Sequence, residues 1–136
     1  MTLVTTSRRS TNESRAVARD LAFALGARYL ARGKRGIREL HETDSHFFIL
    51  SQEERGLLLR SYYEGDLDYE RRILKVECKQ REGLITRGAI TSDAEFYKKI
   101  SRNCPVIYEE GSEGYIRVDG PQKRQTYIKL EKTTGG

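Results

Sequence analysis

Basic side chains gather in the first third of the chain, and phosphate binding is the chemistry that they could perform. They flank two turn-like stretches, residues 6–15 (TSRRSTNESR) and residues 32–36 (RGKRG). Arginine can bind a phosphate through two parallel N–H···O bonds, and grouped cations with few acids nearby repel one another until a polyanion joins them. The alternative to a phosphate-binding site is that these side chains are separate from one another and solvated. The candidate nucleic-acid-binding residues are Arg8, Arg9, Arg15, Arg19, Arg32, Lys34, Arg35 and Arg38.

Catalytic and metal-binding patterns are absent from the sequence. Cys78 or Cys104 with His41 or His46 would be the only pairing of a nucleophile with a base, and nothing in their spacing joins them. Both histidines precede the cysteines and no C-x-x-C pair occurs, which matches no common zinc site. The phosphate-binding loop G-x-x-x-x-G-K-[ST] is also missing. We predict a non-enzymatic protein with buried thiols and without a metal, a cofactor or a small-molecule substrate.

The charge of the chain is divided unevenly along its length. The net charge is +5, but residues 1–38 carry nine basic and two acidic side chains, a net +7. Residues 39–72 carry a net −5 and residues 73–136 a net +3. A basic segment of this kind favours a polyanionic partner, and nucleic acid is the commonest one. The acidic middle segment would repel RNA or bind a basic protein.

The sequence pattern of the first half predicts the strands and the helix that would position the basic residues. Residues 2–6 are rich in β-branched side chains and predict a strand. Ser10 and Glu13 have the spacing of a capping box, and Gly26 is a natural helix stop, so the spacing predicts a helix over residues 13–25. Residues 27–31 predict a second strand. If the two strands are parallel, the loops that follow them leave the sheet at one edge and bring the two basic stretches together.

The remaining pattern alternates strands with short helices. A brief helix is predicted over residues 37–42, an acidic loop over residues 64–68, and a helix that opens at residues 91–93 and ends before Pro105. Further strands are predicted at residues 46–50, 57–63, 73–78, 106–108, 115–118 and 126–130. The order of these elements predicts an α/β or α+β fold with a mixed sheet, built as two tandem β-α-β-β units, residues 1–70 and 71–136.

Several linked motifs resemble the Brix-domain family of ribosome-biogenesis proteins. Family members show a strand that ends in Thr-Ser-Arg, a helix bearing Arg and Leu, and an Arg-Gly-Lys loop before a short Leu-rich helix. The matching residues here are 6–8, 15–25, 32–34 and 37–40. The turn Gly120-Pro121-Gln122 is similar to the family's Gly-Pro-Arg turn, except that Gln122 replaces the arginine. Residues 41–117 resemble the family in element order more than in motif.

The resemblance implies an archaeal single-domain member made of two halves, each similar to the anticodon-binding domain of some aminoacyl-tRNA synthetases. It further implies a role in rRNA processing or subunit assembly, with precursor ribosomal RNA as the partner and ribosomal or assembly proteins as further partners. The alternative function is a protein-protein scaffold with only incidental RNA contact. No apolar run approaches the roughly 20 residues that span a bilayer, and residues 1–6 lack a basic segment before an apolar one, so we expect a cytoplasmic protein.

Overall fold

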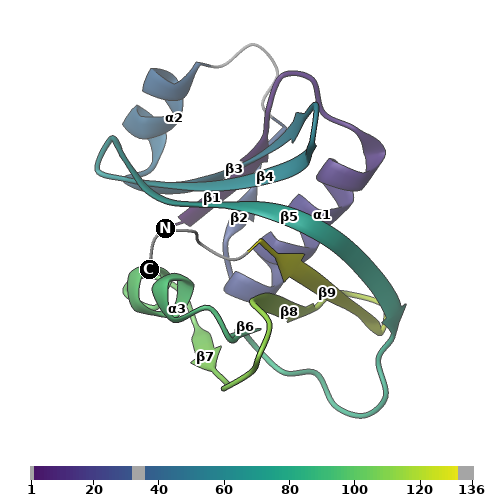
Figure 1. Cartoon of the computed structure of the whole chain (residues 1–136). Coiled ribbons are helices and arrows are strands. Elements are labelled where there is room, and N and C mark those ends of the chain that lie inside the picture. Colours follow the sequence, from purple (N-terminus) through teal and green to yellow (C-terminus); the bar gives the residue numbers. More distant parts are fainter. Residues whose placement is uncertain (1, 32–35, 132–136) are drawn as a thin grey trace.

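One mixed sheet of nine strands, together with three helices, makes up the part of the chain that the computed structural model describes, residues 2–31 and 36–131 (Figure 1). The predicted mixed α+β class is confirmed. The elements follow one another as β1 (Thr2–Thr6), α1 (Asn12–Leu25), β2 (Arg28–Tyr29), α2 (Ile37–Thr43), β3 (His46–Glu53), β4 (Gly56–Tyr63), β5 (Asp66–Gln80), β6 (Ala89–Thr91), α3 (Ala94–Ile100), β7 (Val106–Tyr108), β8 (Tyr115–Asp119) and β9 (Arg124–Leu130).

The strand order of the sheet is β2-β1-β3-β4-β5-β9-β8-β6-β7. Strand β1 is parallel to both β2 and β3, so β1-α1-β2 is the crossover that the sequence predicts. Strand β6 is likewise parallel to β7, and α3 lies between them in the chain. Outward from β5, the strands therefore follow the order β4-β3-β1-β2 on one side and β9-β8-β6-β7 on the other.

The central strand β5 joins two arms of the sheet: the first arm is β4-β3-β1-β2 and the second arm is β9-β8-β6-β7. It spans residues 66–80 and pairs antiparallel with β4 through its first part and with β9 through its second. The predicted boundary between residues 70 and 71 therefore falls inside a continuous strand. The matching strand order on either side of β5 is consistent with two tandem halves, and that division stays a prediction.

Helix α1 begins one residue before the predicted range. Thr11, not Ser10, is the N-cap: its hydroxyl accepts a hydrogen bond from the Ser14 amide at 3.1 Å, and the Ser14 hydroxyl accepts one from the Thr11 amide at 2.8 Å. The predicted Ser10–Glu13 capping box is therefore wrong by one position, because neighbouring polar residues can all serve as caps. The stop at Gly26 is confirmed by its left-handed φ of 66°.

Alternating side chains place α1 and α2 on opposite faces of the sheet. On one face, Val4, Phe48 and Leu50 join the large core under α1 and α3. On the other face, the intervening apolar residues form a smaller cluster with α2, namely Leu3, Leu40, Phe47 and Ile49. Side chains alternate along a strand, so each face needs its own cover. Helix α3 contributes Phe96 and Ile100, which are fully buried in the larger core.

One connection differs from the sequence prediction, and another has an unusual backbone. The predicted acidic loop 64–68 is reduced to the turn at Glu64 and Gly65, because Asp66 already begins β5. The turn between β8 and β9 holds Gln122 and Lys123 at φ values of 58° and 61°, a left-handed conformation that side chains with a Cβ adopt at a cost. No described helix is both long enough and apolar enough to span a membrane.

The β8–β9 turn allows a direct stability test. Because glycine adopts left-handed backbone freely but also loses more entropy on folding, we expect Lys123→Gly to raise the free energy of unfolding by roughly 0.5 to 1 kcal/mol. Urea unfolding of both proteins measures the change. Lys98→Gly, inside α3, is the opposed control and should destabilise by a similar amount. A loss of stability in Lys123→Gly would contradict the expectation.

Candidate nucleic-acid interface

The loop that follows β1 places Arg8 and Arg9 at the edge where the parallel strands β1 and β3 end. The Ser7 amide donates to the Leu50 carbonyl at 2.9 Å, which extends the β1–β3 pairing to the start of the loop. Both arginine side chains are exposed. They line a hollow of about 520 Å³ together with residues from the end of β3 and the start of α2, and the complete lining is Ser7, Arg8, Arg9, Gly36, Ser51, Gln52 and Glu53.

The two basic stretches approach each other through this hollow. Gly36, the last residue of the stretch 32–36, lines it beside Arg8 and Arg9. This is the arrangement that a parallel β1-α1-β2 crossover predicts, because loops after parallel neighbours leave the sheet at one edge. Arg32, Lys34 and Arg35 themselves lie outside the described residues. Their part in the interface therefore stays a prediction.

Arg15 holds the loop in place instead of projecting freely into solvent. Its guanidinium donates to the Ser10 hydroxyl at 2.8 Å and to the Ser10 carbonyl at 3.3 Å, and a short hydrogen bond joins it to the Asn12 side chain. None of these acceptors is an acid, so the positive charge of Arg15 is kept. Arg15 would thus support a phosphate site by orienting the loop that carries Arg8 and Arg9.

The other described candidates lie along α1 and α2. The Arg19 guanidinium is 5.2 Å from the centre of the Tyr29 ring, a cation–π contact that connects α1 to β2. Arg38 is exposed in the first turn of α2. Like the side chain of Arg9, its side chain makes no hydrogen bond or ion pair with another described residue.

Acidic side chains near the interface are few, and several acids of the middle segment are neutralised internally. Glu53 lines the hollow and reduces its positive charge. In the net-negative segment, three ion pairs use acids within the fold: Asp44 with Arg28 at 3.1 Å, Asp68 with Arg102 at 2.5 Å, and Glu70 with Arg60 at 2.7 Å. Arg71 and Arg72 of this segment pair in turn with Asp93 and Glu131 outside it, so the ion pairs do not remove the negative balance of the segment.

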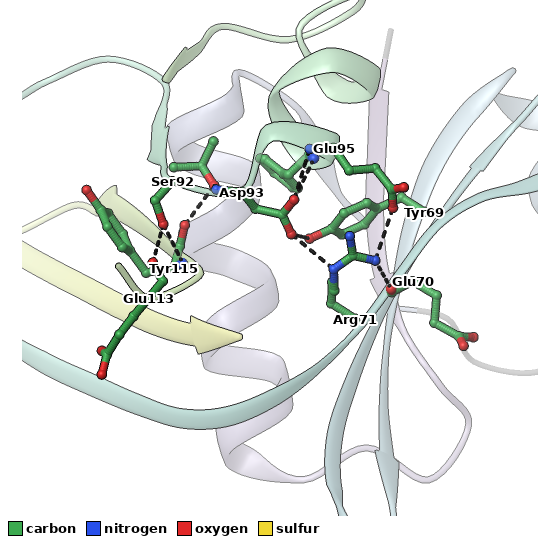
Figure 2. A network of polar contacts seen from close by, with 10 residues as sticks. Tyr69, Glu70, Arg71, Ser92, Asp93, Glu95, Glu113 and Tyr115 are labelled. Carbon is green, nitrogen blue, oxygen red and sulfur yellow. Dashed lines mark hydrogen bonds and ion pairs between the residues drawn. The ribbon is translucent and has the colours of Figure 1, made fainter. Parts of the chain in front are cut away.

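A polar network that the sequence did not reveal joins β5 to α3 (Figure 2). The carboxylate of Asp93 accepts hydrogen bonds from the amides of Glu95 and Phe96 at 3.0 and 3.2 Å, which caps α3. Its other oxygen accepts the Tyr69 hydroxyl at 2.8 Å and pairs with the Arg71 guanidinium at 3.1 Å. Burial, and then the Asp93 charge, raise the pKa of Tyr69 well above its usual value. The charges satisfy one another, which indicates a structural role.

The cysteines and His46 do not form a catalytic pair. Cys104 donates to the Thr2 hydroxyl at 3.3 Å, and Thr2 in turn hydrogen-bonds His46 at 3.1 Å, so a hydroxyl separates the thiol from the imidazole. Burial raises the pKa of the Cys104 thiol, which disfavours the nucleophilic thiolate. Cys78 is exposed, contrary to the prediction of two buried thiols, because it lies near the end of β5. The His41 side chain lies outside the described part.

Comparison with solved structures identifies the fold. The chain is similar to Mil, an archaeal Imp4-like protein, with a TM-score of 0.71 and 14% identity over 100% of both chains. It is also similar to a probable ribosomal biogenesis protein from Aeropyrum pernix K1, with a TM-score of 0.67 and 17% identity over 98% of this chain and 97% of that one. Neither a protein-family model nor a curated protein sequence matches the chain. The chain therefore shares the fold of these two proteins over its whole length.

Proposed function

We propose that this protein is a ribosome-biogenesis factor of the Brix-domain family that binds precursor ribosomal RNA through the basic surface around Arg8 and Arg9. The observation that carries the proposal is the hollow in which these two arginines meet the end of the second basic stretch. Four of its seven lining residues, both arginines among them, belong to the segment of net charge +7. The fold, shared with an Imp4-like protein and a probable ribosomal biogenesis protein, supports the same role.

The surface would bind RNA mainly through phosphates. The Arg8 and Arg9 guanidinium groups can each bind a phosphate with two N–H donors, while Arg15 keeps their loop in position and Arg19 extends the basic surface along α1. Such contacts set affinity and orientation without reading the base sequence. The proposal assigns no catalytic step to the protein, and the RNA is its partner rather than its substrate.

Salt-dependent binding tests this function directly. We expect a labelled, structured rRNA fragment to bind with an affinity that falls steeply with salt. Arg8→Ala with Arg9→Ala should weaken binding roughly tenfold near 0.1 M salt and lower the slope of log K against log salt by about 1 to 2, because fewer counterions are released. Fluorescence anisotropy over a series of salt concentrations measures both quantities, and thermal unfolding verifies that the variant is folded.

A matched control removes the same charge elsewhere. Arg87 and Lys98 are exposed and belong to the second half of the chain, so replacing both with alanine changes the net charge equally. This control should bind with nearly unchanged affinity and slope. Equal losses in both double variants would show that only total charge matters. Salt-independent binding, or no binding by the wild type, would overturn the proposed function.

A protein-protein scaffold is the second candidate, and exposed apolar side chains favour it. Phe23 on α1 and Ile85 in the β5–β6 connection are 50% and 44% exposed and line one hollow of about 350 Å³. Pull-down of cellular partners with and without nuclease separates the two functions. Protein partners that persist after nuclease, combined with weak RNA binding in vitro, would favour the scaffold.

A further inference from the structure

The outer face of β5, β8 and β9 bears a hollow of about 640 Å³, and none of the three helices contributes to its lining. On the corresponding outer face of the first arm, α2 covers the sheet and Leu40 packs on Phe47 and Ile49. In the view of Figure 1, α1 lies behind the sheet, on the far side of β5. The six lining residues of the open hollow are Glu77, Cys78, Lys79, Arg117, Gln125 and Tyr127.

An aromatic pair joins the corresponding strands of both arms, but only one pair is covered by a helix. In the first arm, Phe47 on β3 stacks on Tyr62 on β4, with ring centres 5.0 Å apart and planes inclined by 15°. In the second arm, Tyr115 on β8 stacks on Tyr127 on β9 at 5.1 Å and 22°. The first pair packs in the cluster under α2, whereas Tyr127 lines the open hollow. An aromatic ring is thus presented at an uncovered sheet face.

Charged and polar groups surround this ring in a pattern that suits a nucleotide. Arg117 is the direct register partner of Tyr127 on β8. The Lys79 side chain makes no hydrogen bond or ion pair with a described residue. Glu77 pairs with Lys75 at 2.7 Å, and Arg117 pairs at 3.8 Å with Glu109, a half-exposed carboxylate outside the lining. The two cations can hold phosphates and the ring can stack on a base. The Gln125 NH2 group donates to the Asp119 carboxylate at 3.0 Å, so the side-chain oxygen of Gln125 is the group that can accept a hydrogen bond from a base edge.

The lining also argues against a protein helix as the occupant. A helix that packs on a sheet buries an apolar stripe, and the opposing surface must then be apolar. None of the six lining side chains is aliphatic, and the nearest counterpart, the cluster under α2, contains two leucines, an isoleucine and a phenylalanine. The chemistry of the hollow therefore matches an unpaired nucleotide better than an amphipathic helix.

We propose that the hollow binds an unpaired nucleotide of a single-stranded RNA segment, with the base stacked on Tyr127 and phosphates held by Arg117 and Lys79. The proposal rests on the proposed function, since it gives the RNA a second contact on the other arm of the sheet. The basic loops around Arg8 would bind a structured part of the RNA by its phosphates. The open face would hold an adjacent unpaired segment.

A short, unstructured, fluorescein-labelled RNA of eight nucleotides tests the site by anisotropy. Tyr127→Leu should weaken binding about tenfold, because an aliphatic side chain cannot stack on a base. Tyr127→Phe keeps the ring and should bind within about twofold of the wild type. Tyr108→Leu is the matched control, because Tyr108 forms the exposed aromatic pair with Tyr97 away from the hollow, and it should not change the affinity.

The outcomes separate this site from the basic surface. Unchanged affinity of Tyr127→Leu for the short RNA would overturn the nucleotide site, and a loss of structured-RNA binding in the Arg8 and Arg9 variant would still support the proposed function. Equal losses of RNA affinity in Tyr108→Leu and Tyr127→Leu would also overturn the nucleotide site, since any exposed tyrosine would then contribute equally to RNA binding. If the wild type does not bind the short RNA, the assignment fails and a protein partner becomes the occupant to test. Photo-cross-linking of a 4-thiouridine oligonucleotide to residues 125–129 would support the site.

Discussion

Asp93→Ala is expected to lower the free energy of unfolding by about 3 to 5 kcal/mol, because it leaves the buried Tyr69 hydroxyl without its acceptor and the buried Arg71 guanidinium with only the more exposed Glu95 carboxylate as an ion-pair partner. The Arg71 and Asp93 side chains are only 10% and 11% exposed, and Tyr69 is 2% exposed (Figure 2). The substitution also removes the cap of α3, whose contribution is about 1 kcal/mol. One carboxylate makes all of these contacts, so the separate losses of stability do not add. The expected range is therefore the one for breaking the buried ion pair.

Urea unfolding followed by circular dichroism measures this effect, and two further variants separate its causes. Asp93→Asn keeps an oxygen for the helix cap but loses the charge that faces Arg71, so it should be less destabilising than alanine. Glu95→Gln is the matched control: its ion pair with Arg71, at 3.0 Å, involves a side chain that is 41% exposed, and should cost less than about 1 kcal/mol. An Asp93→Ala protein as stable as Glu95→Gln would show that the network does not stabilise the fold.

The wild-type protein is expected to lose about 3 kcal/mol of stability between pH 6.5 and pH 4 through His46 alone. Burial lowers the pKa of His46 to about 4, and the nearby Asp68 charge opposes this shift only in part. The neutral ring hydrogen-bonds Thr2 and Ser61 at 3.1 and 2.9 Å. Because the unfolded state binds a proton below pH 6.5 and the folded state does not, the stability is fully present above pH 6.5 and falls as the pH drops towards 4.

His46→Gln isolates this contribution, because glutamine can hydrogen-bond the same neighbours without titrating. Carboxylates also titrate in this range, so the quantity to measure is the difference between the two proteins in denaturant unfolding at pH 7, 6, 5 and 4.5. The difference in the free energy of unfolding between the wild type and the variant should shrink as the pH falls. The NMR shifts of the His46 ring provide a second measurement, and a titration midpoint near 6.5 would contradict the expectation.

Local sequence signals predicted the elements that are defined by a few neighbouring residues. Gly26 ends α1 because it accepts a left-handed backbone, and the runs of β-favouring residues at 46–50 and 57–63 indicate the paired strands β3 and β4. The N-cap was misplaced because Ser10, Thr11 and Asn12 are all capping types. Strand β6 was not predicted, because its last residue, Thr91, was assigned to the start of the following helix. The length of β5 was underestimated because residues 66–72 are mostly charged, and their pairing with β4 keeps them in the sheet.

The sequence by itself determined the basic first third, the mixed fold class and the parallel β1-α1-β2 unit, because charge, periodicity and turn residues are local properties. Only the tertiary structure brought Gly36 to the hollow beside Arg8 and Arg9, joined Asp93 to Tyr69 and Arg71, and left Tyr127 uncovered while Tyr62 packs near α2. Each of these depends on the register of strands that are distant in the chain. Such pairings are decided by the packing of the whole sheet, which a local pattern does not contain.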